Sequence, residues 1–316
     1  PNARAYTETC AAIALIMWAW RMLALDGDAA YADILELALY NGFLAGLSLD
    51  GLSYFYVNPL ADDGTHRRQP WFDCACCPPN IARLLASLPG YCYSVSDQTL
   101  WCHLYAANTG RIALPDGRRV ALRQETAYPW AGEVTLTLDS GGDFGLRLRI
   151  PGWCSDASLT LNDEPVAAQP RPGHYADIRR VWRAGDVVRL RLPMPPRRIV
   201  SHPYVLENAG RAALMRGPLL YCVEAADHPG LDLRDLMLPA AGLKAQERAD
   251  LLGGIVAVTA NGRLRPPNKG WADQLYRTTD AIGRRSPGKQ IEITAIPYYA
   301  WANREAGQMQ VWMIAD

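Results

Sequence analysis

Two short segments of the sequence contain residue types that could bind a metal ion. Residues 8–10 read Glu-Thr-Cys, and residues 74–77 read Cys-Ala-Cys-Cys. Cysteine sulfurs and carboxylate oxygens are both zinc ligands, and one carboxylate with three sulfurs makes a four-coordinate set. We therefore predict that Glu8, Cys10, Cys76 and Cys77 converge on one zinc ion, and that one of the thiolates does covalent chemistry.

The double proline Pro78-Pro79 follows the second segment directly. Proline is favoured in the first turn of a helix, so Cys77 is expected at or near the N-cap, with Cys76 just before it. The free N–H groups and the positive end of the helix dipole then favour thiolate over thiol. A disulfide between these two neighbours is a poor explanation, because its eight-membered ring is strained.

Glu8 and Cys10 are two residues apart. On a regular helix this spacing points the two side chains to different faces. If residues 7–9 form an extended lead-in to the helix, with Thr7 or Thr9 as its cap, the two side chains point the same way. Two helix N-termini could then supply the four ligands.

The spacing of the cysteines alone leaves three interpretations open: metal or thiolate chemistry, buried structural thiols, and a redox role. Cys-x-Cys-Cys is not a standard zinc-finger spacing. A glutamate ligand favours a catalytic site, because closed structural zinc sites use cysteine and histidine. The other four cysteines adjoin aromatic residues, and we predict that they are buried free thiols: Cys92, Cys102, Cys154 and Cys222.

Residues 1–93 are predicted to be mainly helical. The segment Ala11–Leu25 is apolar nearly all round, which predicts a helix buried on both sides. A second helix is expected over Ala29–Asn41, with Asp28 as its cap, and a third over Asn80–Leu88. Between the second and third, Tyr54–Val57 looks like a short strand.

From Tyr91 the period changes to the alternation of antiparallel strands, and the run Pro193–Pro196 marks a boundary. Strands at this spacing predict β-sandwiches. We therefore expect a helical region over 1–93, a β-sandwich over 94–197 and a second small β-sandwich over 198–316. A polar loop region is also expected within residues 246–285.

The composition excludes few functions but limits the partners. The chain has 316 residues and a formal net charge of zero, which gives no electrostatic case for nucleic acid or an acidic membrane surface. The longest apolar run, Cys10–Trp20, is too short to cross a bilayer. No signal peptide is visible, so a cytoplasmic location is expected, with a periplasmic or secreted one as alternatives. Because the chain does not begin with Met, we expect a fragment or a processed product.

Several short motifs follow one another along the whole chain. They are Glu8-x-Cys10, Ala38-Leu39-Tyr40-Asn41-Gly42, Phe55-Tyr56-Val57-Asn58-Pro59-Leu60, Cys74-x-Cys76-Cys77-Pro78-Pro79-Asn80, Arg149-Ile150-Pro151-Gly152-Trp153, Met215-Arg216-Gly217-Pro218-Leu219 and Ala295-Ile296-Pro297-Tyr298-Tyr299-Ala300-Trp301. As a set they resemble glycoside hydrolase family 127, the β-L-arabinofuranosidases. The resemblance implies an (α/α)6 barrel followed by two β-sandwich domains, with residues 1–93 as the C-terminal part of the barrel.

The same resemblance implies a retaining exo-glycosidase that acts on an L-arabinofuranoside or a related sugar, with cysteine in place of the usual carboxylate nucleophile. By motif position, Cys76 would be the nucleophile, and Glu8, Cys10 and Cys77 would complete the zinc sphere around it. Three further residues are candidates for binding sugar hydroxyls, with packing, turn or loop roles as the alternatives: Tyr56, Asn58 and His66.

The general acid/base that the resemblance implies is a glutamate upstream of Glu8-x-Cys10, before Pro1. We therefore predict no or very low activity for this chain alone. The alternative functions are a non-catalytic carbohydrate-binding or structural zinc protein, and a thiol oxidoreductase with a reversible disulfide within Cys74–Cys77. A homodimer is left open.

Overall fold

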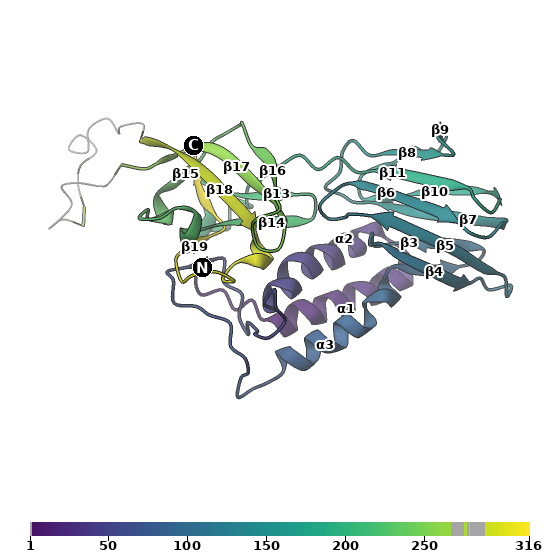
Figure 1. The fold of residues 1–316 in the computed structure, drawn as a ribbon, viewed down its shortest axis with the longest axis horizontal. Coiled ribbons are helices and arrows are strands. Elements are labelled where there is room, and N and C mark those ends of the chain that lie inside the picture. The colour runs from purple at the N-terminus through teal and green to yellow at the C-terminus, as the bar shows by residue number, and fades with distance from the viewer. Residues whose placement is uncertain (1, 267–274, 277, 279–287) are drawn as a thin grey trace.

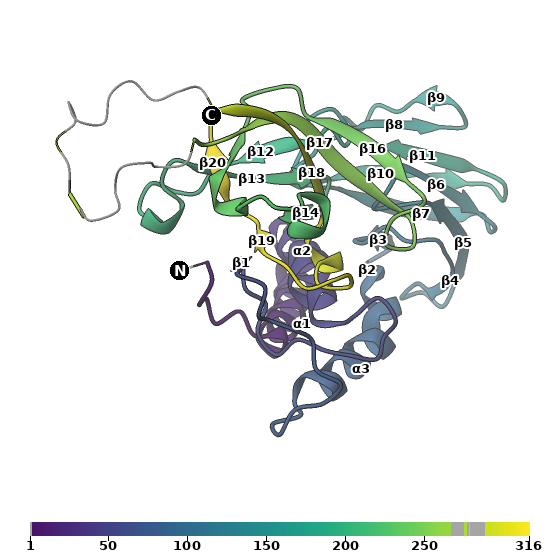
Figure 2. The ribbon, with the colours of Figure 1, turned by 60° about the vertical axis from the view of Figure 1, so that its left-hand side comes forward.

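The computed structural model describes residues 2–266, 275, 276, 278 and 288–316. In this part of the chain a layer of α-helices lies along one side of two regions of β-strands (Figure 1). The middle of the chain forms one β region, and the C-terminal residues form the other. The view in Figure 2 shows the same helices beneath both regions. The molecule is thus mostly β-sheet with few helices.

The helical layer contains α1 (Thr9–Asp26), α2 (Ala29–Leu37) and α3 (Cys77–Ser87). Gly27 adopts a left-handed conformation (φ 73°) that ends α1, and the Asp28 carboxylate accepts a hydrogen bond from the backbone N–H of Ala30 at the start of α2. The Asp28 cap was predicted from the sequence.

The second helix differs from the prediction over Ala29–Asn41. The α-helix ends at Leu37 and continues as a π-helical turn over Ala38–Phe43, followed by a 3₁₀ turn over Leu44–Gly46. The Asn41 amide donates to the Leu37 carbonyl within its own helix and to the Pro218 carbonyl in the C-terminal region. A side chain that bonds outside its own helix accounts for the local change in winding.

The prediction that α1 is buried on both sides is wrong. Ile13, Ile16 and Leu23 are buried, but Trp18 is 67% exposed and Leu25 is 80% exposed. In the part of the chain that the structure describes, α1 packs against α2, α3 and the π-helical turn. Among the described residues, α1 is the one helix that is long and apolar enough to cross a membrane, by length and composition alone.

The segment between the π-helical turn and α3 is irregular. The predicted strand over Tyr54–Val57 is wrong, because Tyr54 and Val57 make only isolated bridges, to Leu47, Gln69 and Glu8. Instead, a short strand β1 (Ala61–Asp62) pairs with β19 (Met309–Gln310) near the C-terminus. The segment is therefore held by the C-terminal region while it leads to the cysteines.

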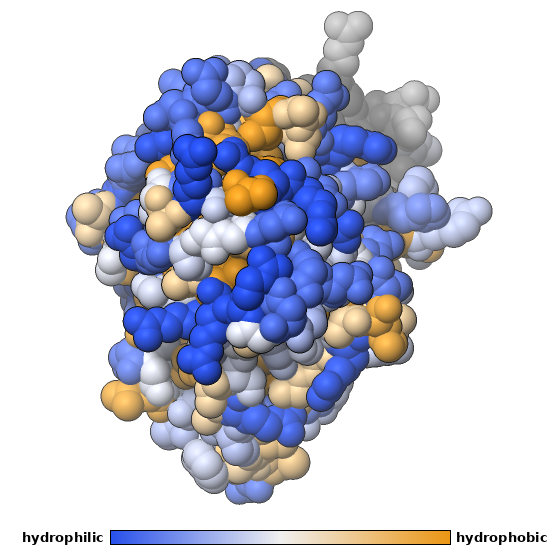
Figure 3. Space-filling model, turned by 90° about the vertical axis from the view of Figure 1, so that its right-hand side faces the viewer, coloured by the Kyte–Doolittle hydropathy of each residue, from blue (hydrophilic) through white to orange (hydrophobic). Residues whose placement is uncertain are grey.

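The middle region is a pair of sheets around one core. One sheet has the order β10-β7-β3-β2, and the other has the order β4-β5-β6-β11-β8-β9. Alternating residues point inward, among them Leu122 and Leu136 from one sheet and Leu146 and Leu148 from the other. The strands are β2 (Tyr93–Ser96), β3 (Thr99–Cys102), β4 (Asn108–Ala113), β5 (Arg119–Thr126), β6 (Glu133–Leu138), β7 (Gly142–Ile150), β8 (Ser158–Leu161), β9 (Glu164–Pro165), β10 (His174–Trp182) and β11 (Val187–Arg191). Hydrophilic residues predominate at the end of the molecule that this region forms, with apolar ones scattered among them (Figure 3).

The C-terminal region is one 10-stranded sheet rather than two separate sheets. Strand β13 pairs with both β20 and β14, which closes a ring of β14, β18, β17, β15, β20 and β13 around a buried cluster. The strands are β12 (Arg197–Ile199), β13 (Arg211–Arg216), β14 (Leu219–Glu224), β15 (Leu236–Leu238), β16 (Lys244–Arg248), β17 (Ile255–Leu264), β18 (Lys289–Pro297) and β20 (Met313–Ala315). Within the segment 246–285, which was predicted to contain a polar loop region, residues 255–264 form β17, and residues 267–274, 277 and 279–285 lie outside the described part.

A buried ion-pair network joins the helical layer to the middle region. The guanidinium of Arg149 on β7 is fully buried and donates to Asp33 and Glu36 of α2, at 2.5 Å each. Its Nε donates to the carbonyl of His103 at 2.6 Å. The Tyr128 hydroxyl also donates to Glu36. Every charge in this network has a partner, as buried charges require.

We expect Arg149→Leu to destabilise the protein strongly, because two carboxylates would remain without their cation. Removing one partner of a buried pair costs about 3–5 kcal/mol, whereas an exposed pair contributes about 1 kcal/mol or less. Arg147→Leu on the same strand is the matched control, since Arg147 pairs with exposed Asp177. Denaturant titration of both variants measures the difference; equal losses would contradict a special role for Arg149.

Candidate metal and thiolate site

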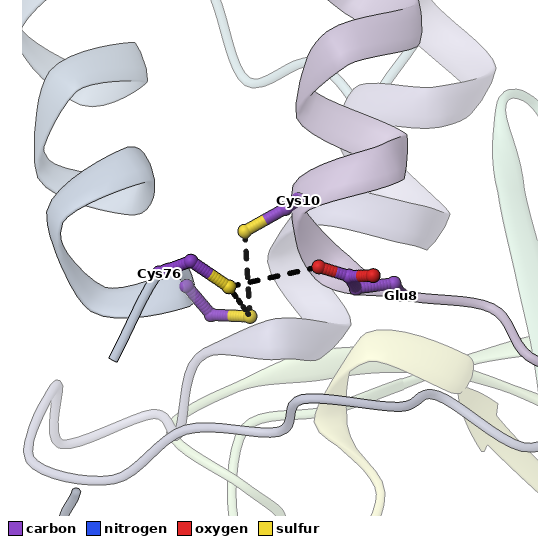
Figure 4. A group of neighbouring side chains, drawn as sticks. Glu8, Cys10 and Cys76 are labelled. Atoms are coloured by element: carbon purple, nitrogen blue, oxygen red, sulfur yellow. Dashed lines mark hydrogen bonds between the residues drawn. The ribbon is translucent and has the colours of Figure 1, made fainter. Parts of the chain in front are cut away.

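The N-terminal ends of α1 and α3 meet, and they bring the two predicted segments together (Figure 4). Glu8 is the N-cap residue of α1, in an extended conformation (φ −69°, ψ 137°), and its side chain makes no capping bond. The carboxylate is therefore free to turn toward the cysteines. Thr7 or Thr9 was expected as the cap; the position belongs to Glu8, because Thr9 is already helical and its hydroxyl bonds the Phe55 carbonyl.

At the start of α3, Cys76 is the N-cap residue and Cys77 is the first helical residue, followed by the two prolines. Each cysteine thus lies one position further into the helix than the sequence suggested. The Cys77 side chain is buried, and the Cys76 side chain is partly exposed. The two free helix ends direct N–H groups and positive dipole ends toward the same place, which favours negatively charged ligands there.

The four predicted ligand atoms lie within 4.8 Å of one another. The Sγ atoms of Cys10 and Cys77 are 3.5 Å apart, and those of Cys76 and Cys77 are 3.8 Å apart. The Cys76 Sγ is 3.6 Å from the Glu8 Oε1. In Figure 4 the carboxylate and the sulfurs point toward one another.

These separations match the edges of a tetrahedron around a metal ion. Metal–sulfur bonds of 2.3 Å and a metal–oxygen bond of 2.0 Å, at tetrahedral angles, place sulfurs about 3.8 Å apart and sulfur and oxygen about 3.5 Å apart. Three of the six edges thus have tetrahedral lengths, and the four side chains could hold a four-coordinate metal ion.

The electrostatics of the group also call for a cation. Burial raises the pKa of Cys77 well above its usual range, and the neighbouring thiols of Cys10 and Cys76 raise it further. Burial likewise raises the pKa of Cys10, while a hydrogen bond from Asn80 opposes this. Thiols that resist ionisation together can all become thiolates when a metal ion lies between them.

Asn80 is a site residue to which the sequence analysis assigned no role. Its Nδ2 donates to the Cys10 Sγ at 3.2 Å. The only signal for it in the sequence is an asparagine one helical turn after Cys76, because residues four apart share a helix face. Its partner belongs to another helix, and spacing along the chain cannot reveal such a contact.

Of the three candidate sugar-binding residues, Tyr56 lies beside the cysteines. Its hydroxyl accepts a hydrogen bond from Tyr6 at 3.4 Å. Its ring packs edge-on against Phe72. A hydroxyl at this place can reach a molecule bound at Cys76.

The amide N–H groups of Asn58 and the Nε2 of His66 lie at hydrogen-bonding distance from groups of the chain itself. The buried Asn58 amide donates to the Thr7 carbonyl and the Thr9 hydroxyl, which fixes the lead-in to α1. The His66 ring stacks on Phe55, and its Nε2 lies 2.8 Å from the Val57 carbonyl oxygen. Sugar binding by these two residues stays a prediction.

Cys74 is exposed and lies outside the group of four. All eight cysteines are free thiols in the structure, and Cys92, Cys102, Cys154 and Cys222 are buried, as predicted. Beside Glu8, a groove of about 440 Å³ runs along α1 and α2, lined by mostly apolar side chains such as Leu15, Leu37 and Leu220.

Comparison with known proteins places almost the whole chain in one family. Residues 1–90 match the profile of the GH127 β-L-arabinofuranosidase catalytic domain, residues 99–194 match the GH127 middle domain, and residues 196–314 match the glycoside hydrolase family 127 C-terminal domain. The chain is 39% identical to a non-reducing end β-L-arabinofuranosidase from Bifidobacterium longum subsp. longum, over 99% of this chain and 49% of that protein.

Solved structures that match this chain belong to the same family. A GH127 β-L-arabinofuranosidase from Geobacillus stearothermophilus T6 is 46% identical to this chain, with a TM-score of 0.91. The match covers 100% of this chain and 51% of the Geobacillus chain. A GH127 β-arabinofuranosidase is 37% identical, with a TM-score of 0.89 over 100% of this chain and 50% of its own. The chain thus spans about half the length of the relatives that it matches.

We expect one equivalent of a thiophilic divalent metal to protect Cys10 and Cys77 of the reduced chain from alkylation. Metal-bound sulfur is less available to an electrophile, and these two sulfurs lie 3.5 Å apart in one site. Cys74 is the internal control, since it lies outside the group and should react at the same rate with and without metal. Mass spectrometry of the alkylated peptides gives the result. Protection spread equally over Cys74 would contradict a single four-ligand site.

Proposed function

The chain belongs to glycoside hydrolase family 127, and from this premise we propose that it is part of a retaining β-L-arabinofuranosidase with a zinc-bound cysteine nucleophile. Its relatives are named for this activity. The single observation that carries the proposal is the group of Glu8, Cys10, Cys76 and Cys77, whose separations suit tetrahedral zinc. The substrate class is an L-arabinofuranoside or a related sugar.

Among the three sulfurs, Cys76 is the best nucleophile. Cys77 is buried, and Cys10 accepts a hydrogen bond from Asn80. Cys76 is partly exposed, lies at the helix N-cap and has Tyr56 beside it. A sulfur that a substrate can approach, at a helix end that favours the thiolate, meets the requirements of a nucleophile.

Zinc, when bound, would hold the Cys76 sulfur as a thiolate near neutral pH and would make it a good leaving group in the second step. The Cys76 sulfur attacks the anomeric carbon, a C–S bond forms, and the glycosidic C–O bond breaks. The leaving oxygen takes a proton from a general acid. Water then attacks the same carbon and gives its proton to the group that acted as the acid, the C–S bond breaks with the electron pair on sulfur, and the configuration is retained overall.

We propose that the general acid comes from another segment. Within the described residues, Glu8 is the one carboxylate in the group of four, and it is a ligand. The apolar faces of α1 and α2 offer a place for that segment, because Leu15, Trp18, Ile34 and Leu37 are exposed there. Since the relatives are about twice as long, we propose that further helices of an (α/α)6 barrel cover this face and carry the acid.

We also propose the domain boundaries 1–93, 94–197 and 198–316. They are supported by the change from helices to strands at β2 and by the proline run before β12. A non-catalytic zinc protein with the same fold would keep the metal but not the reactivity of Cys76. A covalent probe therefore separates these two functions.

We expect a halomethylcarbonyl analogue of L-arabinofuranose to form one covalent adduct on Cys76 of the zinc-loaded chain. The sulfur displaces halide at the position where it would attack the sugar. Peptide mapping by mass spectrometry identifies the modified residue. Cys74→Ser, two residues away, should keep the adduct, whereas Cys76→Ser should lose it. Zinc-loaded protein with inert cysteines would favour the non-catalytic alternative.

We expect this chain to hydrolyse alkyl β-L-arabinofuranosides at no or a very low rate, because such leaving groups need a proton donor that the site lacks. General acid catalysis contributes typically about 10²–10⁴-fold. A 2,4-dinitrophenyl β-L-arabinofuranoside needs little protonation and should release its phenol faster, above the background of Cys76→Ser. Absorbance and sugar analysis measure both rates. Efficient turnover of the alkyl substrate would show that the acid is already present.

A further inference from the structure

We propose that Asn80 is a positioning residue that orients the Cys10 sulfur toward the zinc ion. This inference rests on the proposed zinc centre and adds a residue to which no role has been assigned. It is carried by a contact between the two helices that form the site: the Asn80 Nδ2 lies 3.2 Å from the Cys10 Sγ.

The first turn of α3 determines where the Asn80 side chain lies. The Asn80 backbone N–H donates to the Cys76 carbonyl at 3.2 Å, which is the hydrogen bond of the first helical turn. The side chain of Asn80 therefore projects from the same face as Cys76, one turn further along α3. From there it reaches across to Cys10, in the first turn of α1.

The contact distinguishes Cys10 from the other two sulfurs. Among the described residues, Asn80 is the one side chain whose N–H donates to a sulfur of the group. The contacts of Cys77 are with sulfur, and those of Cys76 are with Glu8, Cys77 and the Tyr56 hydroxyl. An N–H donor directed at one lone pair of a thiolate leaves another lone pair directed at the metal.

Partners outside the ligand sphere orient metal ligands in many proteins, and their loss weakens metal affinity by about 10–100-fold. Cys77 needs no such partner, because its burial in the first turn of α3 already fixes it. Cys10 is only partly buried and projects from a helix whose next residue, Ala11, is exposed. The Asn80 amide supplies the restraint that packing does not.

The test is the zinc affinity of the full chain, measured by competition with a chromophoric chelator. Asn80→Leu keeps the approximate size of the side chain and has a higher helix propensity, so α3 is not weakened. We expect its affinity to fall by about tenfold or more. Asn80→Ala is a second variant in case leucine packs badly, and it should show the same loss.

Arg83→Leu is a matched control on the same helix. Its Nη2 lies 3.4 Å from the Met17 Sδ, so it too joins α3 to a sulfur on α1, but away from the four ligands. We expect its zinc affinity to equal that of the wild type. A loss of the same size in both variants would mean that general contact between the helices, and not the Asn80 amide, holds the ligand.

Cobalt substitution gives an absorption spectrum that would not change if Asn80 had only a structural role. The thiolate-to-cobalt charge-transfer absorption should shift in Asn80→Leu and stay unchanged in Arg83→Leu, because only Asn80 donates to a ligand sulfur. If wild type and Asn80→Leu have the same affinity and the same spectrum, the inference fails and the zinc centre stands. If the wild type binds no zinc, both fail.

Discussion

The buried guanidinium of Arg149 is the interaction on which the position of the helices depends. A fully buried cation needs carboxylates at bonding distance, and α2 supplies them as Asp33 and Glu36. This fixes α2 against the strands of the middle region. The tight Gly27 turn then fixes α1, whose N-terminal end carries Glu8 and Cys10. The ligand geometry at one end of α1 is thus connected to an ion-pair network near its other end.

The motifs that carry the family resemblance lie largely where regions of the chain meet. Asn41 donates to the Pro218 carbonyl and accepts from the Leu220 N–H, which joins the π-helical turn to β14. The Tyr298 hydroxyl donates to the Pro59 carbonyl. Arg68 donates to the carbonyls of Ala45 and Trp301. These contacts hold the irregular segment before α3, and this places the cysteines at the start of α3 beside the N-terminal end of α1.

Local rules explain which features could be predicted from the sequence. Proline in a first turn and the Asp28 cap indicated where α3 and α2 start, and alternation placed most strands. The four ligands were predictable because each pair lies at one helix end. Features that depend on distant partners were missed: the π-helical turn at Asn41, the bridges of Tyr54, the closed ring of strands and the contact from Asn80. The exposed face of α1 was missed because an apolar sequence shows which side chains avoid water, and does not show which elements pack against them.

The charges of the site explain why its three cysteines need different surroundings. In the proposed zinc centre, three thiolates and one carboxylate would place four negative charges within 4.8 Å, more than one divalent cation neutralises. In the proposed mechanism, the Cys76 sulfur loses its charge when it bonds carbon, so repulsion from its neighbours assists the attack. The two other sulfurs have to keep their charge and their position throughout. Burial fixes the position of Cys77, and we infer that a donor such as Asn80 fixes that of Cys10.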